Sequence, residues 1–207
     1  MFIVLEGIDG AGKGRQRTEL ELLLKGTSNI KTLDFPNHES PIYKHIIHPA
    51  LHEEINLNPA SWFLSFALDQ ILITDMIKPT VNSESKHFIA DGYFTTTIAY
   101  QCILNKYFTT KTALSFAREF DIPRPDLAIF IDVDPKIALS RKRNEEGHDE
   151  GMDMFERSME KQQKIRKAFL KMVNQEIFCK WEVVDGSKGI VEVRDSIIQV
   201  LERRNLI

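Results

Sequence analysis

Gly7-Ile8-Asp9-Gly10-Ala11-Gly12-Lys13-Gly14 stands between a short apolar run and a helical pattern near the start of the chain. The spacing GxxxxGK between a strand and a helix predicts a loop that binds phosphate groups. Glycines let successive backbone N–H groups turn inward, and the N-terminus of the following helix adds partial positive charge. Lys13 is then placed to reach the β- and γ-phosphates of a nucleotide. The stretch therefore predicts a nucleotide-binding protein.

The residue after Lys13 departs from the usual pattern. A Ser or Thr commonly ligates Mg²⁺ at this position, and this chain has Gly14. A hydroxyl ligand is therefore excluded here, so water and Asp91 would have to supply more of the octahedron. Because Mg²⁺ gives up its waters reluctantly, we still expect Mg²⁺ as the cofactor, held by Asp91 through water.

Short apolar runs alternate with longer helical patterns along the rest of the chain. The runs are bounded by polar or turn residues, as buried parallel strands usually are, and Asn58-Pro59 and Asp134-Pro135 are start signals for helices. The alternation predicts an α/β fold of three layers, with a parallel sheet between helices and ligands beyond the carboxyl ends of the strands. The five predicted strands are Phe2–Leu5, Lys31–Phe35, Phe88–Ala90, Leu127–Ile131 and Glu182–Val184.

Composition limits the classes of function. At 207 residues the chain is long enough for one well-cored domain, so we expect a single domain over residues 1–207. The net charge of −3 implies no bulk attraction to nucleic acid or to anionic membranes. No apolar run approaches the ~20 residues that span a bilayer, and the sequence starts with a strand pattern instead of a signal peptide. The two cysteines match no disulfide framework or zinc pattern, so we expect both to be free thiols. Free thiols are typical of a reducing compartment, so we expect a protein of the cytoplasm.

One segment breaks the alternation. From Arg141 to Asp153 charged residues crowd together, with Gly147 and Gly151 as possible pivots and few apolar anchors. Both a solvated loop and a mobile lid over a phosphate site fit this composition, because lids need weak anchoring to open. We predict that residues 141–156 form a short mobile lid.

Once the phosphate loop is placed, the order of the other motifs resembles the thymidylate kinase family. FIVLEGIDGAGK at residues 2–13 is similar to the first strand and loop of that family. DGYFTTTIAYQ at residues 91–101 resembles the family signature DRYxxSxxAYQ and is the most family-specific stretch. The resemblance spans most of the chain, with further similarity at Asp34–Pro36, Phe63–Pro79, Pro125–Leu127, Asp132–Pro135 and Val184–Ser187.

The resemblance implies a P-loop kinase fold and a phosphotransferase. The expected reaction moves the γ-phosphoryl group of ATP to dTMP, giving dTDP and ADP, a step of dTTP biosynthesis that uses Mg²⁺. Expected partners are these small nucleotides and a second copy of the chain, because the family is usually dimeric. Trp62 and Phe63 could belong to the dimer contact or equally to the core.

The resemblance also assigns roles to individual residues. Lys13, Asp9 and Asp91 would be the catalytic residues, with Asp9 reaching the 3′-hydroxyl of the acceptor's sugar. Phe66 would stack on thymine, and Arg141 would lie against adenine. Each role has a structural alternative, such as core packing for Phe66 or a solvated helix face for Arg141. The remaining acceptor-binding residues are Thr96, Thr97, Tyr100 and Gln101, and the remaining ATP-binding residues are Gly7, Ile8, Gly10, Ala11, Gly12, Gly14, Arg15, Gly186 and Ser187.

Several arginines of the family pattern are absent. Gly92 takes the place of the arginine in DRY, and Gln70 that of a helix arginine; Asp34, Met154 and Gly10 stand at three further positions where relatives carry one. Phosphoryl transfer depends on positioning and on stabilising negative charge, so these losses leave alternatives open. The chain could be an active kinase with relocated arginines, a degenerate nucleotide-binding relative without kinase activity, or a kinase for another deoxynucleotide or a nucleoside. The candidates for relocated charge are Arg15, Arg17, Lys44, Arg118, Arg124, Lys142, Arg143 and Arg157.

Overall fold

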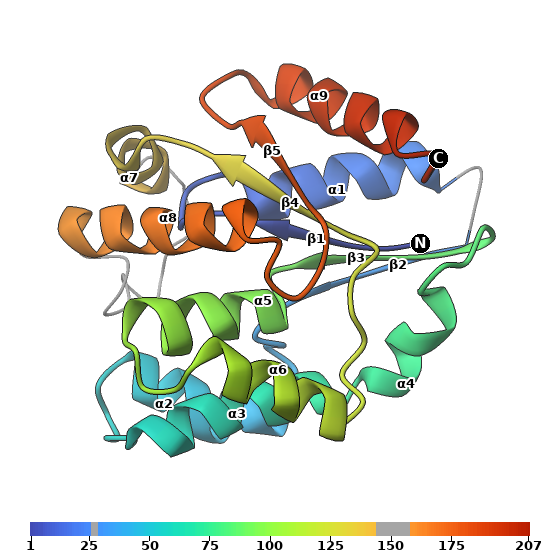
Figure 1. Ribbon diagram of the computed structural model, residues 1–207. Coiled ribbons are helices and arrows are strands. Elements are labelled where there is room, and N and C mark those ends of the chain that lie inside the picture. The colour runs from blue at the N-terminus through green and yellow to red at the C-terminus, as the bar shows by residue number, and fades with distance from the viewer. Residues whose placement is uncertain (26–28, 144–157) are drawn as a thin grey trace.

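A five-stranded parallel sheet forms the centre of the molecule in the computed structural model, which describes residues 1–25, 29–143 and 158–207 (Figure 1). The strands lie in the order β2-β3-β1-β4-β5, so the predicted sheet is confirmed. Each strand overlaps its predicted run and differs from it by one or two residues at the ends. The bounds are β1 Phe2–Glu6, β2 Asn29–Asp34, β3 Lys86–Asp91, β4 Leu127–Asp132 and β5 Trp181–Asp185.

Helices cover both faces of the sheet, which confirms the predicted three layers. Figure 1 shows α1 (Lys13–Leu24) and α9 (Ile190–Arg203) on one face and α8 (Met159–Asn174) on the other. Further helical segments lie beyond α8, on the side away from α1. They include η1 Tyr43–Ile47, α2 His48–Leu51, α3 Pro59–Ile71, α5 Phe94–Thr97, η3 Ile98–Leu104 and α6 Thr110–Glu119. Three short elements complete the described chain: α4 Thr74–Ile77, η2 Lys78–Thr80 and α7 Pro135–Arg143.

The parallel pairing brings the functional ends of the strands to one edge of the sheet. Strand β1 is fully buried between β3 and β4, and the phosphate loop follows it directly. In the register of β2 with β3, Asp34 is the partner of Asp91, and Leu5 of β1 pairs with the same Asp91. Both chain termini lie at the opposite end of the sheet (Figure 1). The edge after β1, β2 and β3 is therefore where a ligand of the phosphate loop must bind.

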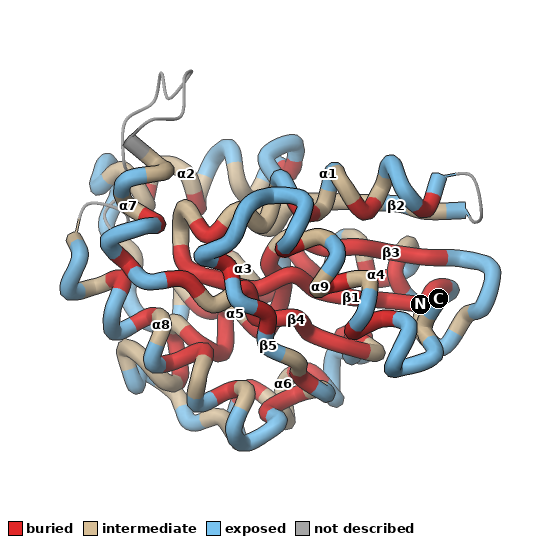
Figure 2. Tube along the Cα trace, turned by 90° about the horizontal axis from the view of Figure 1, so that it is seen from above, coloured by how far each residue is buried: buried red, intermediate tan, exposed pale blue. Residues whose placement is uncertain are grey.

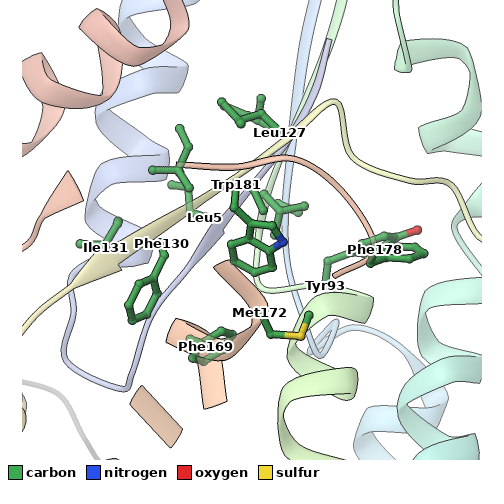
Figure 3. Close-up of a cluster of buried hydrophobic side chains, with 14 of the residues drawn as sticks. Leu5, Tyr93, Leu127, Phe130, Ile131, Phe169, Met172, Phe178 and Trp181 are labelled. Atoms are coloured by element: carbon green, nitrogen blue, oxygen red, sulfur yellow. The ribbon is translucent and has the colours of Figure 1, made fainter. Parts of the chain in front are cut away.

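The core fixes α8 against the sheet. Buried residues concentrate along the strands and the inner faces of the helices (Figure 2). Phe130 of β4 stacks on Phe169 of α8 with ring centroids 5.5 Å apart, and Met172 and Trp181 lie in the same cluster (Figure 3). Such a close-packed contact gives α8 a defined position, and this position matters for the site below.

Helix α3 begins where the sequence predicted. The Asn58 side chain accepts a hydrogen bond from the Ser61 N–H at 2.9 Å, and Pro59 occupies the first turn. Phe63 is buried against the aromatic rings of Phe94 and Phe116, so its suggested place in a dimer contact is wrong and it belongs to the core.

The predicted lid lies outside the described residues apart from Arg141–Arg143, the last turn of α7. Met154 and Arg157 fall in the same undescribed stretch. Among the described helices, no single one is long and apolar enough to cross a membrane.

Candidate active site

The phosphate loop depends on glycines in a left-handed backbone conformation. Gly10 has φ +81° and Gly12 has φ +89°, values that side-chain-bearing residues adopt at a cost. A Cβ on Gly10 would lie 2.2 Å from the carbonyl oxygen of Ala138 in α7, whereas a Cβ on Gly12 would meet nothing within 4 Å. Helix α7 thus closes over Gly10, so the loop cannot carry the arginine that some relatives place there.

Lys13 lies over the loop. Its Nζ donates a hydrogen bond to the carbonyl oxygen of Gly7 at 3.2 Å and lies 3.9 Å from Oδ1 of Asp91. Gly7 itself admits no side chain, because a Cβ there would be 3.0 Å from the carbonyl oxygen of Ile131. The ammonium group is therefore held between the loop and the end of β3, where the phosphates of a nucleotide would lie.

Asp91 lies beside the position of the missing hydroxyl. Its Oδ2 is 3.3 Å from where a Cβ on Gly14 would be. Burial raises the pKa of Asp91, and the positive charge of Lys13 opposes that rise. No group of three or more His, Cys, Asp or Glu side chains among the described residues could hold a metal ion. Proteins nevertheless often bind Mg²⁺ through one carboxylate, with substrate phosphates and waters as the other ligands. The residues present therefore fit Mg²⁺.

A single cavity connects the phosphate loop with the predicted acceptor residues. It begins at Lys13 and Asp9 and extends to Phe66 and Gln101 on the other helical layer. The structure thus brings together residues from β1, α3, α5 and η3. The complete lining is Glu6, Gly7, Asp9, Lys13, Phe35, Pro36, Leu51, Phe66, Gly92, Thr96, Thr97, Tyr100 and Gln101.

The far end of this cavity combines an aromatic ring with buried amides. Phe66 is half-buried and stacks on Trp62, with ring centroids 5.9 Å apart. Gln101 is 2% exposed, and its Oε1 has no hydrogen-bond partner in the protein. Gln70 donates from Nε2 to Oγ1 of Thr97 at 3.3 Å, so its amide is held against the cavity wall. A planar ring with polar edges suits such a pocket, since a buried amide oxygen needs a donor.

Asp9 has a partner that sequence reasoning missed. Gln162 of α8 is fully buried and donates from Nε2 to Oδ2 of Asp9 at 3.1 Å. The two residues are 153 positions apart, and only the packing of α8 on β4 brings them together. Gln162 therefore fixes the orientation of the carboxylate that faces the cavity.

Glu6 is the second residue that sequence reasoning missed. It ends β1, is 1% exposed and accepts hydrogen bonds from the hydroxyls of Thr95 at 2.5 Å and Thr96 at 2.9 Å. Burial raises its pKa to about 7, and the two threonine hydroxyls and Lys13 offset only part of that rise. A carboxyl group at the end of an otherwise apolar strand was the available signal, since such groups are rarely buried without a function or a partner.

Arg141 joins α7 to the loop after β5. Its guanidinium donates to the carbonyl oxygens of Gly186 at 2.7 Å, Ser187 at 3.3 Å and Lys188 at 3.1 Å. The three residues predicted for the adenine side are thus in direct contact. Arg15, also predicted to bind ATP, instead pairs with Glu19 at 3.1 Å and is 59% exposed.

Comparison with known proteins places the chain among nucleotide kinases. A family model described as thymidylate kinase matches residues 5–197. A probable thymidylate kinase of Methanosphaera stadtmanae is 33% identical over 207 residues, which cover 98% of this chain and 100% of the relative. The thymidylate kinase of Chlorobium luteolum is 27% identical, with 99% and 98% covered. A solved structure of thymidylate kinase from Candida albicans shares the fold, with a TM-score of 0.75 at 22% identity over 99% of this chain and 92% of that one.

Proposed function

This chain belongs to the thymidylate kinase family, and from that premise we infer that it is a phosphotransferase that moves the γ-phosphoryl group of ATP to dTMP. The observation that carries the inference is the continuous cavity from Lys13 of the phosphate loop to Phe66 and Gln101. It joins the phosphate loop to the residues proposed to bind the base of the acceptor. Transfer between two bound nucleotides needs this arrangement, because catalysis comes mainly from positioning and charge stabilisation.

The roles of the protein's own groups follow from their positions. An oxygen of the dTMP phosphate attacks the γ-phosphorus, and the bond from phosphorus to the bridging oxygen breaks, leaving ADP. Lys13 stabilises the negative charge on the transferred group from its position between Gly7 and Asp91. Asp9, oriented by Gln162, accepts a hydrogen bond from the sugar hydroxyl of the acceptor. Phe66 stacks on the base, and Gln101 pairs with its edge.

Mg²⁺ is part of the proposal. When bound, the ion would neutralise charge on the transferred phosphates. Asp91 would hold it, and Gly14 leaves room for water beside that carboxylate. On the adenine side, Arg141 with Gly186 and Ser187 would frame the base, because these three groups already contact one another.

A homodimer is also part of the proposal, through a face other than the aromatic one considered from the sequence. Leu64 and Leu68 of α3 and Leu72, directly after its last residue, recur at helical spacing and are 51%, 42% and 56% exposed. A row of exposed leucines on one helix face is typical of a protein interface. Light scattering of the native chain should give a dimer, and Leu68→Lys should shift it toward monomer. A native monomer at high concentration would contradict the proposed dimer.

We expect this enzyme in the cytoplasm with its nucleotide substrates.

An assay of ADP release with ATP, Mg²⁺ and a panel of acceptors tests the function. The panel is dTMP, dUMP, dCMP, dGMP, AMP and thymidine, and mass spectrometry identifies each product. We expect dTMP to be used with the highest kcat/KM and to give dTDP. Equal use of AMP and dTMP, or no acceptor-dependent ADP release, would contradict the proposal.

A further inference from the structure

The cavity wall carries too little positive charge for the acceptor that the proposed function requires. Its lining includes the carboxyl groups of Glu6 and Asp9, and Lys13 is the one lysine or arginine among the described residues that line it. A phosphate monoester brings roughly −1.5 to −2 further charges near neutral pH. At about 4 Å each like-charged pair costs from ~1 kcal/mol in water to ~4 kcal/mol near a protein surface. Lys13 already faces the phosphates of ATP, so the acceptor's phosphate needs another cation.

Arg17 lies at the same edge of the sheet as the phosphate loop and could supply this cation. The residue follows Lys13 by four positions in α1, so both side chains project from the same helix face. Its Nη1 lies 2.8 Å from Oδ1 of Asp34, the last residue of β2. Asp34 is the register partner of Asp91 on β3. The guanidinium therefore lies one strand away from the carboxylate beside the phosphate loop.

The contact between Arg17 and Asp34 leaves binding capacity unused. Nε of Arg17 is buried and has no hydrogen-bond partner in the protein, and Oδ1 of Asp34 likewise accepts no aligned hydrogen bond despite the short distance. The Asp34 side chain is 48% exposed, against 21% for Arg17. Partly exposed ion pairs of this kind contribute about 0–1 kcal/mol, so a ligand can displace Asp34 at little cost. A phosphate suits the vacated fork, because guanidinium binds it through two parallel N–H groups.

Three of the other candidates for relocated charge have partners elsewhere. Arg118 is paired with its sequence neighbour Glu119, and Arg124 lies over the ring of Phe178, with 5.7 Å from its Cζ to the ring centroid. Lys44 is paired with Glu39. We propose that Arg17 binds the phosphate of the acceptor nucleotide and that Asp34 holds the guanidinium in place until the acceptor arrives. The proposal rests on the proposed function, since it assumes a nucleoside monophosphate as acceptor.

Calorimetric binding of dTMP and of thymidine to the native chain and to Arg17→Ala, without ATP, tests this assignment. Thymidine lacks the phosphate and serves as the internal reference. We expect the Kd for dTMP to rise by about tenfold or more in the variant and the Kd for thymidine to change by less than about twofold. Arg203→Ala is the matched control, because Arg203 also loses an ion pair, with Glu182 at 2.9 Å, at the far end of α9. It should leave both constants unchanged.

Asp34→Asn separates binding from a structural role of the ion pair. Neutralising Asp34 frees Arg17, so we expect dTMP to bind more tightly in this variant, whereas a structural pair would weaken both ligands in both variants. That common weakening, or an unchanged Kd for dTMP in Arg17→Ala, would overturn the proposal. These calorimetric experiments measure binding alone. The assignment of Arg17 can therefore fail while the native chain still converts dTMP to dTDP. Failure of the proposed function would instead appear as no acceptor-dependent ADP release from a chain that folds normally.

Discussion

The two halves of the active site are built from different parts of the chain. In the half around the phosphate loop, backbone groups and Lys13 surround the site, and glycines are required by φ values and by close contacts at Gly7 and Gly10. In the proposed acceptor half, side chains line the cavity: Phe66, Thr97 and Gln101, with Gln70 hydrogen-bonded to Thr97. Backbone geometry tolerates little change, whereas a side-chain charge can move to a neighbouring element that reaches the same place. This difference fits a chain that has the GxxxxGK spacing of the loop but has Gly92 and Gln70 at positions where the resemblance leads us to expect arginines.

The largest effect is expected at Lys13, the side chain that lies in the half of the site around the phosphate loop. Lys13→Ala should lower kcat by on the order of 10²–10³ or more, because it removes the cation nearest to the transferred group. The apparent melting temperature should remain close to that of the native chain. Near-native turnover in the variant would show that the phosphate-loop assignment is wrong.

Two glycine variants measure how strictly the backbone conformation of the phosphate loop requires glycine. Gly12→Ala should cost about 1–2 kcal/mol from its left-handed conformation alone. Gly10→Ala carries similar strain and also a clash with the carbonyl of Ala138 at 2.2 Å, so it should be clearly less stable. Chemical denaturation of the nucleotide-free variants gives the comparison. Equal losses would mean that α7 does not close over the loop as described.

Much of the fold could be predicted from the sequence, because its signals are local. The GxxxxGK spacing, the apolar runs and the Asn58 cap each act within a few residues of themselves, and the structure has the corresponding elements. Strand ends were less well predicted. The predicted run Phe88–Ala90 stops before Asp91, a polar residue that continues the ladder because Asp34 of β2 pairs with it, whereas the run Lys31–Phe35 extends one residue past the end of β2.

The site was harder to predict where it depends on contacts between distant segments. Gln162 reaches Asp9 only through the packing of α8, and no local pattern marks it. Phe63 and Phe66 look alike in sequence, yet Phe63 faces the core and Phe66 faces the cavity. A helical period gives the spacing of such residues but not which neighbour covers each one.

Glu6 connects the two halves, and its ionisation should affect stability. Folding raises its pKa from the ordinary 4.5 to about 7, so its contribution to stability is fully present below about pH 4.5 and is lost as the pH rises through 7. Glu6→Gln removes this dependence and should be more stable than the native chain at pH 8, by on the order of 1–3 kcal/mol, but not at pH 4.5. Denaturation across that range, with Glu202→Gln as an exposed control on α9, checks the expectation. Parallel curves for the native chain and Glu6→Gln would contradict it.

A smaller effect is expected for the base-binding amide of the acceptor half. Gln101→Ala should raise the KM for dTMP by about tenfold, the cost of one lost polar contact, and change the KM for ATP much less. Steady-state kinetics with each substrate varied in turn gives both constants. A larger change for ATP than for dTMP would place Gln101 in the other half.

Gly92 tests most directly whether the acceptor half has relocated its positive charge. Gly92 has φ +70°, and a Cβ there would lie 3.2 Å from both the Phe35 carbonyl and Oγ1 of Thr96, so any side chain adds strain. Gly92→Ala carries that strain without a guanidinium, and its comparison with Gly92→Arg isolates the effect of the charge. The measurement is kcat/KM for dTMP at fixed ATP and Mg²⁺ in the native chain, in both variants and in Gly92→Arg combined with Gln70→Arg. We expect that neither arginine-bearing variant exceeds the native chain or Gly92→Ala, because a cation already binds the acceptor's phosphate. A gain of about tenfold or more over the native chain, ~1.4 kcal/mol of transition-state stabilisation, would contradict it.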